Sequence, residues 1–442
     1  MRAFSSEFWA LGRRDIFIIV LVASLFLLTG LIQDWILALT ILNMAIISAV
    51  MTLGVNIQWG YAGLFNVGTM GFVALGGLAA VLVSMPSVSE TWQAGGPQIL
   101  LGLSLFLLGV FLSVFAWRRL EGSRWRGWAV GSIFALSLFI GRMILDPAVS
   151  AVESVDPAAT GYLGGLGWPI LLSWPVGGLL AGLAAWFIGR ITLGLRSDYL
   201  AIATLGISEI VIAILKNEDW LARGVKNVTG LPRPVPAEVD LQNDPSFLAI
   251  TGSLGAEPVF TSIIVVKLAY ASLFLITLLG LLWLSQTALC SPWGRMMRAI
   301  RDNEEAAEAM GKDVSGRRLQ AFVLGSVVCG IAGAMMTTMD GQFTPGAYQP
   351  LRFTFLIWVM VVVGGSGNNL GSVVGGFLIW FCWVQVEPLG IWLMSVITSG
   401  LAEESFLRLH LIEGAAYMRM LTMGLILLLV LRFSPRGLIP ER

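Results

Sequence analysis

Long apolar segments separated by short polar connections occupy almost the whole of this 442-residue chain. A helix needs about 20 mostly apolar residues to cross a membrane, whereas the strands of a membrane barrel alternate apolar and polar positions over about 10 residues. The segments here are too long and too continuous for barrel strands, so the pattern predicts an all-α, polytopic membrane protein. Spans are expected at residues 16–32, 36–56, 60–84, 98–117, 128–145, 168–188, 199–215, 263–285, 319–339 and 418–431.

Two shorter apolar pieces, residues 353–363 and 373–386, lie on either side of a Gly/Asn loop at residues 364–371. Each piece is short for a full crossing, and interrupted segments of this kind are found along the permeation pathways of transporters. A plain cytoplasmic turn is the alternative interpretation of the loop. With this pair counted as a hairpin or as a re-entrant pair, the chain is expected to have about 10–12 transmembrane helices.

Basic residues near the ends of the spans orient the chain, because cytoplasmic loops carry an excess of lysine and arginine. Arg2, Arg13 and Arg14 predict a cytoplasmic N-terminus. Counting spans from there places the other basic connections and the C-terminus on the same side. Those connections contain Arg118, Arg119, Arg124, Arg126, Arg190, Arg196, the charged stretch 295–318, Arg432, Arg436 and Arg442.

The composition agrees with a membrane protein, since 57% of the residues are hydrophobic and 12% are charged, against about 45–50% and about 25% in soluble domains. A net charge of zero gives no support for nucleic-acid binding. The single histidine and three scattered cysteines predict neither a metal site nor a disulfide framework. The chain lacks the GxxxxGK[ST] phosphate loop, so it cannot hydrolyse ATP by a P-loop of its own. We expect neither direct catalysis nor a cofactor in this chain.

The charged stretch at residues 295–318 holds six basic and five acidic residues between two apolar segments. Its apolar positions recur at helical spacing, which predicts helices held at the membrane surface. Glu305, Ala306, Ala307 and Gly311 are the predicted contacts for a soluble partner, because small residues allow close approach and carboxylates can pair with arginines. A solvated interfacial helix without a partner is the alternative.

Glycines are dense between Gly60 and Gly77. Such a density either lets helices pack closely or breaks a helix and exposes its backbone groups. Asn56, Gln58 and Asn66 lie beside these glycines, and polar side chains at membrane depth are costly unless they are paired or wet. We therefore predict these three residues as candidates for a substrate pathway.

Glu209 is an ionisable residue inside an apolar run, and such a residue is a functional hypothesis by default. It joins the candidate pathway residues. Structural pairing with Lys216 or Asn217, or a place near the membrane face, is an equally good interpretation.

Two polar segments are expected on the outer side of the membrane. Residues 216–262 are polar and rich in proline, and residues 387–417 have the mixed composition of an amphipathic helix lying on the surface. Both could contact an extracytoplasmic partner, or they could be ordinary connecting loops.

Four sets of residues in a fixed order carry a family resemblance. They are Gly54-Val55-Asn56 with Gly60-Tyr61-Ala62-Gly63; residues 195–205 with Glu209 after them; residues 291–311 with Leu319-Gln320-Ala321-Phe322; and residues 361–367 with Phe433-Ser434-Pro435-Arg436-Gly437-Leu438. In these motifs the chain resembles the membrane-spanning subunits of LIV-type ABC importers of branched-chain amino acids. The resemblance covers residues of about 36–84, 170–231 and 263–442.

The chain departs from the family pattern in two places. Residues 85–168 look like an inserted helical hairpin region, and residues 227–233 replace the usual Thr-Gly-Gly-Pro-like run. These departures bear on the substrate more than on the transport mechanism.

The resemblance implies a single permease domain over residues 1–442 in a bacterial inner membrane, with both termini in the cytoplasm. The implied partners are a second permease subunit, two cytoplasmic ATPase subunits that bind the ATP, and a periplasmic solute-binding protein. Residues 286–318 would couple this chain to the ATPases. The alternatives are a permease for amides or urea, an ion-coupled secondary transporter, and a channel or scaffold subunit.

Overall fold

A computed structural model describes residues 12–157, 160–400 and 405–441 of the protein. Within these ranges, ten helices are long and apolar enough to cross a membrane, and two shorter apolar helices accompany them. The strands β1 (Val228–Thr229) and β2 (Gln342–Phe343) form a two-stranded antiparallel sheet in which Val228 pairs with Phe343. The prediction of an all-α, polytopic membrane protein is confirmed.

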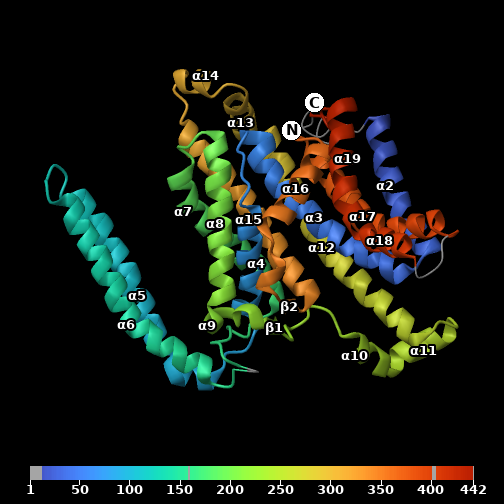
Figure 1. The fold of residues 1–442 in the computed structure, drawn as a ribbon, viewed down its shortest axis with the longest axis horizontal. Coiled ribbons are helices and arrows are strands. Elements are labelled where there is room, and N and C mark those ends of the chain that lie inside the picture. Colours follow the sequence, from blue (N-terminus) through green and yellow to red (C-terminus); the bar gives the residue numbers. More distant parts are fainter. Residues whose placement is uncertain (1–11, 158–159, 401–404, 442) are drawn as a thin grey trace.

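Membrane-length and shorter apolar helices alternate in direction through the molecule (Figure 1). α2 begins and α19 ends on the side that carries α13 and α14, which we call the α13 side; β1, β2, α9, α10 and α11 lie on the opposite side. The apolar helices are α2 (Arg13–Ile32), α3 (Trp35–Ala62), α4 (Thr69–Ser84), α5 (Ser89–Arg119), α6 (Arg126–Ser154), α7 (Ser173–Thr192), α8 (Ser197–Asn217), α12 (Pro258–Cys290), α15 (Val314–Asp340), α16 (Pro350–Gly364), α17 (Asn369–Ile397) and α19 (Met418–Phe433).

The connections also contain short helices. Those of the α13 side are α13 (Pro292–Asp302) and α14 (Glu304–Ala309), so the predicted charged surface helices are present. The remaining short helices are η1 (Ile170–Leu172), α9 (Asp219–Ala222), η2 (Gly224–Lys226), α10 (Glu238–Asn243), α11 (Pro245–Ser253), η3 (Pro345–Ala347), α18 (Phe406–Gly414) and η4 (Ala415–Tyr417).

α15 is the central helix, and it packs against α3, α4 and α7. Glycines permit these contacts: a Cβ on Gly76 of α4 would lie 1.9 Å from the carbonyl oxygen of Gly330, and one on Gly54 of α3 would lie 2.7 Å from that of Gly325. Small residues at crossings let helix backbones approach closely in a membrane. Gly76 therefore allows close helix packing. This is one of the two interpretations, close packing or helix breaking, that the sequence left open for these glycines.

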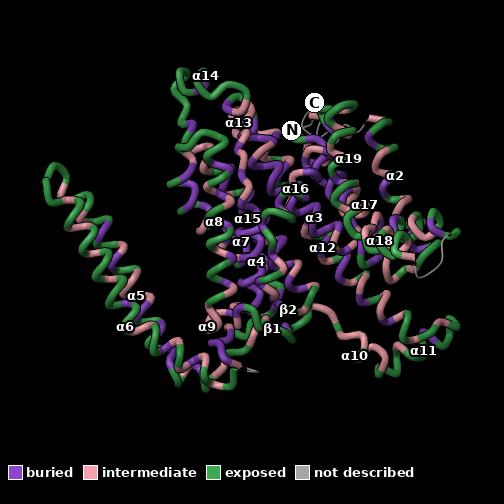
Figure 2. Tube along the Cα trace, viewed as in Figure 1, coloured by how far each residue is buried: buried purple, intermediate pink, exposed green. Residues whose placement is uncertain are grey.

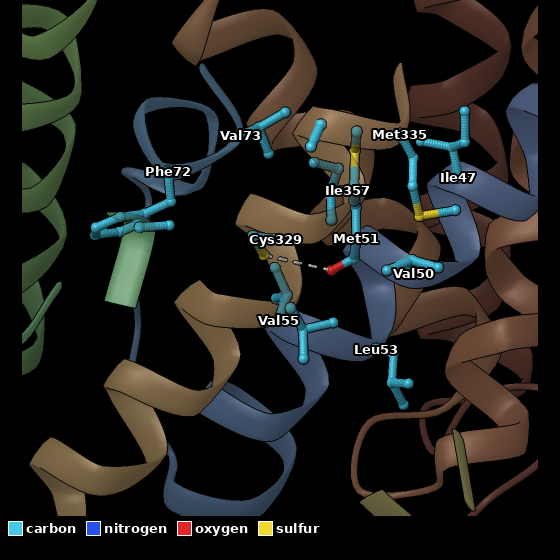
Figure 3. Close-up of a cluster of buried hydrophobic side chains, with 14 of the residues drawn as sticks. Ile47, Val50, Met51, Leu53, Val55, Phe72, Val73, Cys329, Met335 and Ile357 are labelled. Atoms are coloured by element: carbon cyan, nitrogen blue, oxygen red, sulfur yellow. Dashed lines mark hydrogen bonds between the residues drawn. The ribbon is translucent and has the colours of Figure 1, made fainter. Parts of the chain in front are cut away.

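Apolar side chains of α3, α4, α15 and α16 fill the space around these crossings. Figure 3 shows Val50, Val55 and Val73 in one cluster with Cys329, whose sulfur lies 3.8 Å from the carbonyl oxygen of Met51. Figure 2 shows burial concentrated in this central group of helices, while the outer helices are largely exposed. The exposed apolar surface is what a bundle surrounded by lipid requires.

The helix break after α3 was placed wrongly from the sequence. Spans were predicted at 36–56 and 60–84, but α3 continues to Ala62, and residues 63–68 form an irregular connection before the short α4. Gly63 ends α3 in a left-handed conformation with φ of 65°, which glycine adopts without steric cost. The glycine-rich segment thus also breaks a helix. The break follows Ala62, whereas the sequence predicted it before Gly60.

α16 and α17 are two helices joined by a turn at residues 365–368 on the α13 side (Figure 1). Asn368 caps α17 by accepting hydrogen bonds from the backbone nitrogens of Leu370 at 3.0 Å and Gly371 at 3.3 Å. α17 runs through Pro388 to Ile397, so the predicted end at 386 and the predicted surface helix from 387 were wrong. Within that predicted segment, α18 and η4 are the separate short helices.

α5 and α6 form a hairpin that projects away from the other helices (Figure 1). Its base is fastened on the side opposite α13 by the bridge between Ser87 and Gly164 and by the hydrogen bond from the Leu163 nitrogen to the Trp220 oxygen, 3.1 Å. Ile99 and Val152 are fully buried there. A helical hairpin was expected in residues 85–168; its status as an insertion stays a prediction.

Candidate functional site

A cleft of about 860 Å³ opens on the α13 side. Family motifs that are far apart in the sequence meet in its walls, which come from the end of α3, the start of α8, α13, the α16–α17 turn and the C-terminal tail. The lining residues are Trp59, Gly60, Gly63, Phe65, Ser197, Asp198, Arg301, Ser366, Pro435, Arg436 and Glu441. The proximity of these motifs could not be predicted from their order along the chain, because it depends on how the helices pack.

α13 is held in the wall of the cleft by an amphipathic pattern. Gly294, Met297 and Ile300 are its buried residues, at three-residue spacing on one face. Its first turn is capped by Ser291, whose hydroxyl accepts a hydrogen bond from the Trp293 nitrogen at 3.2 Å. The charged residues of α13 consequently point away from the bundle or toward the cleft.

Arg301 is the most connected charged residue of the cleft. Its Nη1 donates to the carbonyl oxygen of Gly60 and to Oε2 of Glu441, 2.8 Å away, and its Nε donates to Asp302 at 3.2 Å. Burial alone would lower the pKa of Arg301, but the hydrogen-bonded Glu441 carboxylate more than offsets burial, and the pKa is raised. The guanidinium therefore stays charged and joins α13 to α3.

α14 and the turn after it carry the four residues predicted to contact a partner. Glu305, Ala306 and Gly311 are exposed, so they are accessible to a partner. Ala307 is 8% exposed and packs into the core of this chain, where it seats α14. Met310, which sequence reasoning did not select, is 78% exposed and adds an apolar side chain to the same surface.

Gly311 follows α14 with φ of 74°, and nothing lies within 4 Å of a Cβ placed on it. It therefore lets the chain turn, as its place after the helix suggested, and it lies open to an approaching surface.

Asn56 is fully buried and hydrogen-bonded within the chain. Its Nδ2 donates to Asn369 Oδ1 at 3.1 Å, and its Oδ1 accepts from the Gly367 nitrogen at 2.8 Å. Asn369 also accepts a hydrogen bond from the Tyr61 hydroxyl and donates to Gln286 Oε1 at 2.9 Å. This network ties α3 and α12 to the α16–α17 turn, and Tyr61, Gln286 and Asn369 are members that sequence reasoning missed.

Gln58 and Asn66 form a second buried network. Gln58 Nε2 donates to the Phe322 oxygen at 2.9 Å and to Ser326 Oγ at 3.0 Å, and its Oε1 accepts from Asn66 Nδ2 at 2.8 Å. The carbonyl oxygen of Asn66 accepts from Trp358 Nε1 at 3.1 Å. The network fixes the irregular segment after α3 against α15 and α16.

Glu209 lies elsewhere, exposed on α8 at a second cleft of about 630 Å³. The cleft is bounded by α8, α16, α17 and α19, and Arg352, Trp383 and Met423 line it with Glu209. Within the described residues, Lys216 lines the same cleft without a hydrogen bond or ion pair to Glu209. The structure thus separates Glu209 from Asn56, Gln58 and Asn66, and it does not give Glu209 the structural pairing considered from the sequence.

The described part of the chain contains no group of three or more His, Cys, Asp and Glu side chains that could hold a metal ion.

Comparison with known proteins identifies related sequences. Residues 123–431 match the family model described as "Branched-chain amino acid transport system / permease component". The probable branched-chain amino acid transport permease protein LivM of Methanocaldococcus jannaschii is 30% identical over 156 residues, covering 35% of this chain and 41% of the relative. The chain has no significant match among solved structures.

Two further relatives extend this comparison. The high-affinity branched-chain amino acid transport system permease protein LivM of Escherichia coli K12 is 25% identical over 239 residues, covering 52% of this chain and 53% of the relative. The fructose import permease protein FrcC of Rhizobium meliloti is 29% identical over 131 residues, covering 28% and 34%. The chain thus spans about half, or less, of the length of these relatives.

Proposed function

Because the chain belongs to the family of permease components of branched-chain amino acid transport systems, we propose that it is a membrane-spanning subunit of an ABC importer. In this proposal it forms the pathway with a second permease subunit in a bacterial inner membrane. Two cytoplasmic ATPase subunits bind the ATP, and a periplasmic solute-binding protein delivers the cargo. The chain moves solute and is not itself an enzyme.

One observation carries the coupling part of the proposal. α13 and α14 lie on the same side as the start of α2 and the end of α19 (Figure 1), and the basic connections 118–126, 190–196 and 432–436 lie there too. An excess of basic residues is typical of the cytoplasmic side. In this proposal the exposed residues Glu305, Ala306, Met310 and Gly311 face the cytoplasm, and we assign them to the ATPase contact.

A matched pair of glycines tests this contact. Gly311 and Gly255 both have positive φ values, 74° and 64°, and neither has an atom within 4 Å of an added Cβ. They follow α14 and α11, which lie on opposite sides of the molecule (Figure 1). Aspartate tolerates this backbone region better than most residues. Gly311→Asp is expected to abolish co-purification of the ATPase with the tagged subunit, and Gly255→Asp to leave it unchanged.

The assay captures the tagged subunit from its native membranes and identifies its partners by mass spectrometry, with thermal unfolding as a check on folding. Capture of a P-loop ATPase by both variants would refute the contact. Capture of none by the wild-type chain would refute the ABC assignment.

The proposed cargo is a branched-chain amino acid or a related solute. The similarity to a fructose import permease favours testing a sugar beside the amino acids, and amides and urea complete the set. Proteoliposomes holding the whole complex and its binding protein would be assayed with labelled leucine, fructose and urea. Uptake is expected to require ATP and to survive ionophores; loss of uptake when the ion gradient collapses would favour a secondary transporter.

A further inference from the structure

The C-terminal tail folds back onto the α16–α17 turn. The Leu438 nitrogen donates to the Val363 oxygen at 2.8 Å, and the Ile439 nitrogen donates to the Gly364 oxygen at 3.0 Å. Asn368 adds a third contact, because its Nδ2 donates to the Pro440 oxygen at 3.1 Å. These bonds satisfy carbonyl groups that the end of α16 leaves without helical partners, so the tail completes the turn.

Packing holds the same tail in place. Ile439 is 2% exposed and lies in an apolar cluster with Val22, Phe26 and Val374. Gly437 has φ of 81°, and a Cβ there would lie 2.4 Å from the Cα of Gly365. Residues 434–441 are therefore a strap that is docked on the α16–α17 turn.

Glu441 carries the strap across to α13. Its Oε2 lies 2.8 Å from Arg301 Nη1, and its Oε1 lies 3.7 Å from Arg298 Nη1. The Glu441 and Arg301 side chains are each 25% exposed, so their attraction is screened less than that of a surface pair. The same Nη1 atom donates to the Gly60 oxygen at the end of α3.

One guanidinium thus connects three elements: the surface helix α13, the end of α3 and, through the strap, the α16–α17 turn. A Cβ on Gly367 would lie 2.5 Å from Glu441 Oε2 and 3.2 Å from Arg301 Nη1, so the turn itself presses against the pair. Charge-assisted hydrogen bonds of this kind are shorter and stronger than neutral ones.

We propose that the Arg301–Glu441 ion pair is a positioning element that passes displacement of α13 to the α16–α17 turn. This proposal rests on the proposed function. When an ATPase moves α13, the pair would make the turn follow and would keep it aligned with α3. Without the pair, α13 stays seated through Met297 and Ile300 and the strap stays docked through Ile439, so the expected defect is uncoupling and not loss of assembly.

The test uses the complete complex with Arg301→Gln, Glu441→Gln and the double variant. Arg295→Gln is the matched control, because Arg295 lies on the same helix but is exposed, and its guanidinium donates to the Cys290 oxygen at 3.3 Å and not to Glu441. The assay measures ATPase co-purification, ATP hydrolysis and solute uptake. For both single variants we expect normal co-purification and about a fivefold or greater fall in solute taken up per ATP hydrolysed, the lower range of coupling between sites.

The double variant separates a linked pair from two independent effects. If the two residues act through each other, the double variant is no worse than the more affected of the two single variants. A normal ratio of uptake to hydrolysis in Glu441→Gln, with ATPase bound, would overturn the proposal, and so would additive losses in the double variant. Failure of the wild-type chain to bind an ATPase would instead refute the proposed function.

The tip of the α5–α6 hairpin carries an independent observation. Four arginines lie within nine residues there, with Glu121 as the one acidic residue among residues 117–128. Three tryptophans surround them and are 51%, 72% and 76% exposed. The arginines are Arg118, Arg119, Arg124 and Arg126, and the tryptophans are Trp117, Trp125 and Trp128.

The tip has the chemistry of a membrane interface. Arg126 lies over the ring of Trp117, with its guanidinium carbon 3.7 Å from the ring centroid, a cation–π contact that holds the charge in place. Tryptophan concentrates at the headgroup level of membranes. Both helices are largely exposed along their length (Figure 2) and expose many apolar residues. The tip points toward the α13 side in Figure 1.

We infer that this tip binds the headgroup of an anionic phospholipid, and this inference does not depend on the transport proposal. The positive charge of the arginines complements the negative charge of an anionic phospholipid headgroup. The tryptophans suit the interfacial layer between the headgroups and the acyl chains. Basic residues near an anionic leaflet each strengthen binding about fivefold, so four together discriminate strongly against a zwitterionic lipid.

Native mass spectrometry of the purified chain tests the site with phosphatidylglycerol and phosphatidylcholine as probes. A variant with all four arginines changed to glutamine is expected to lose bound phosphatidylglycerol and to keep any phosphatidylcholine. Arg142→Gln is the control, because Arg142 lies on α6 away from the tip and pairs with Asp146 at 3.3 Å. The site would be refuted if the fourfold variant retained as much phosphatidylglycerol as the wild-type chain. It would also be refuted if the wild-type chain bound the two lipids equally.

Discussion

Gly76→Ala is a direct test of how α4 and α15 are held together. A Cβ on Gly76 would lie 1.9 Å from the carbonyl oxygen of Gly330 and 2.6 Å from its carbonyl carbon. Ordinary contact begins at 3.4 Å, so the helices must separate locally by 3.4 − 1.9 = 1.5 Å. The obstacle is backbone, which cannot rotate away as a flexible side chain can.

The expected cost follows from overpacking. Forcing extra atoms into a well-packed core costs about 1–3 kcal/mol, and a clash with backbone belongs at the upper end. Alanine favours the helix over glycine by about 1 kcal/mol. We therefore expect Gly76→Ala to lower the free energy of unfolding by about 2 kcal/mol, the difference between these two effects.

The measurement is thermal unfolding of the detergent-solubilised subunit. Gly280→Ala is the matched control, because Gly280 also lies inside a membrane-length helix, α12, but has nothing within 4 Å of an added Cβ. It should be as stable as the wild type or more stable. Gly333→Ala, whose Cβ would lie 1.9 Å from the Val73 oxygen at the same crossing, should repeat the loss. Equal melting of Gly76→Ala and Gly280→Ala would show that this crossing is not tight.

Further predictions concern the polar residues. Gln58→Leu leaves Ser326, the Phe322 oxygen and the Asn66 amide without their partner, and thermal unfolding should detect a loss of about 1–3 kcal/mol. Tyr61→Phe removes one donor to Asn369, and the same measurement should show a smaller loss of about 0.5–1.5 kcal/mol. Glu209→Gln changes an exposed residue of the α8 cleft, so uptake should fall at unchanged stability; unchanged uptake would remove it from the pathway.

The arrangement of spans could be predicted well from the sequence because membrane crossing imposes a length and an apolar composition on each helix. α2, α8 and α15 extend the predicted segments by at most five residues at each end. The surface helices α13 and α14 followed from amphipathic spacing alone, which is a local property. Features that depend only on residues close in the sequence could thus be predicted without a structure.

The irregular segment after α3 could not be predicted from neighbouring residues. The glycine pattern allowed both close packing and a broken helix, and the structure uses Gly76 for the first and Gly63 for the second. What decides between them is the set of partners: Trp358 for the Asn66 carbonyl and Thr204 for the Val67 nitrogen, at 3.1 Å each. These partners lie more than 130 residues away in the chain, so no local pattern specifies them.

The roles of polar residues inside spans were the hardest to predict from the sequence. A buried amide in a membrane requires a hydrogen-bond partner, but the sequence cannot say whether that partner is protein, water or solute. Asn56, Gln58 and Asn66 find protein partners and are at most 1% exposed, so in this conformation they hold helix ends together. Glu209 remains exposed at a cleft with Arg352. Of the four predicted pathway residues, it is therefore the one whose side chain is free to meet a solute without first breaking a bond that the fold needs.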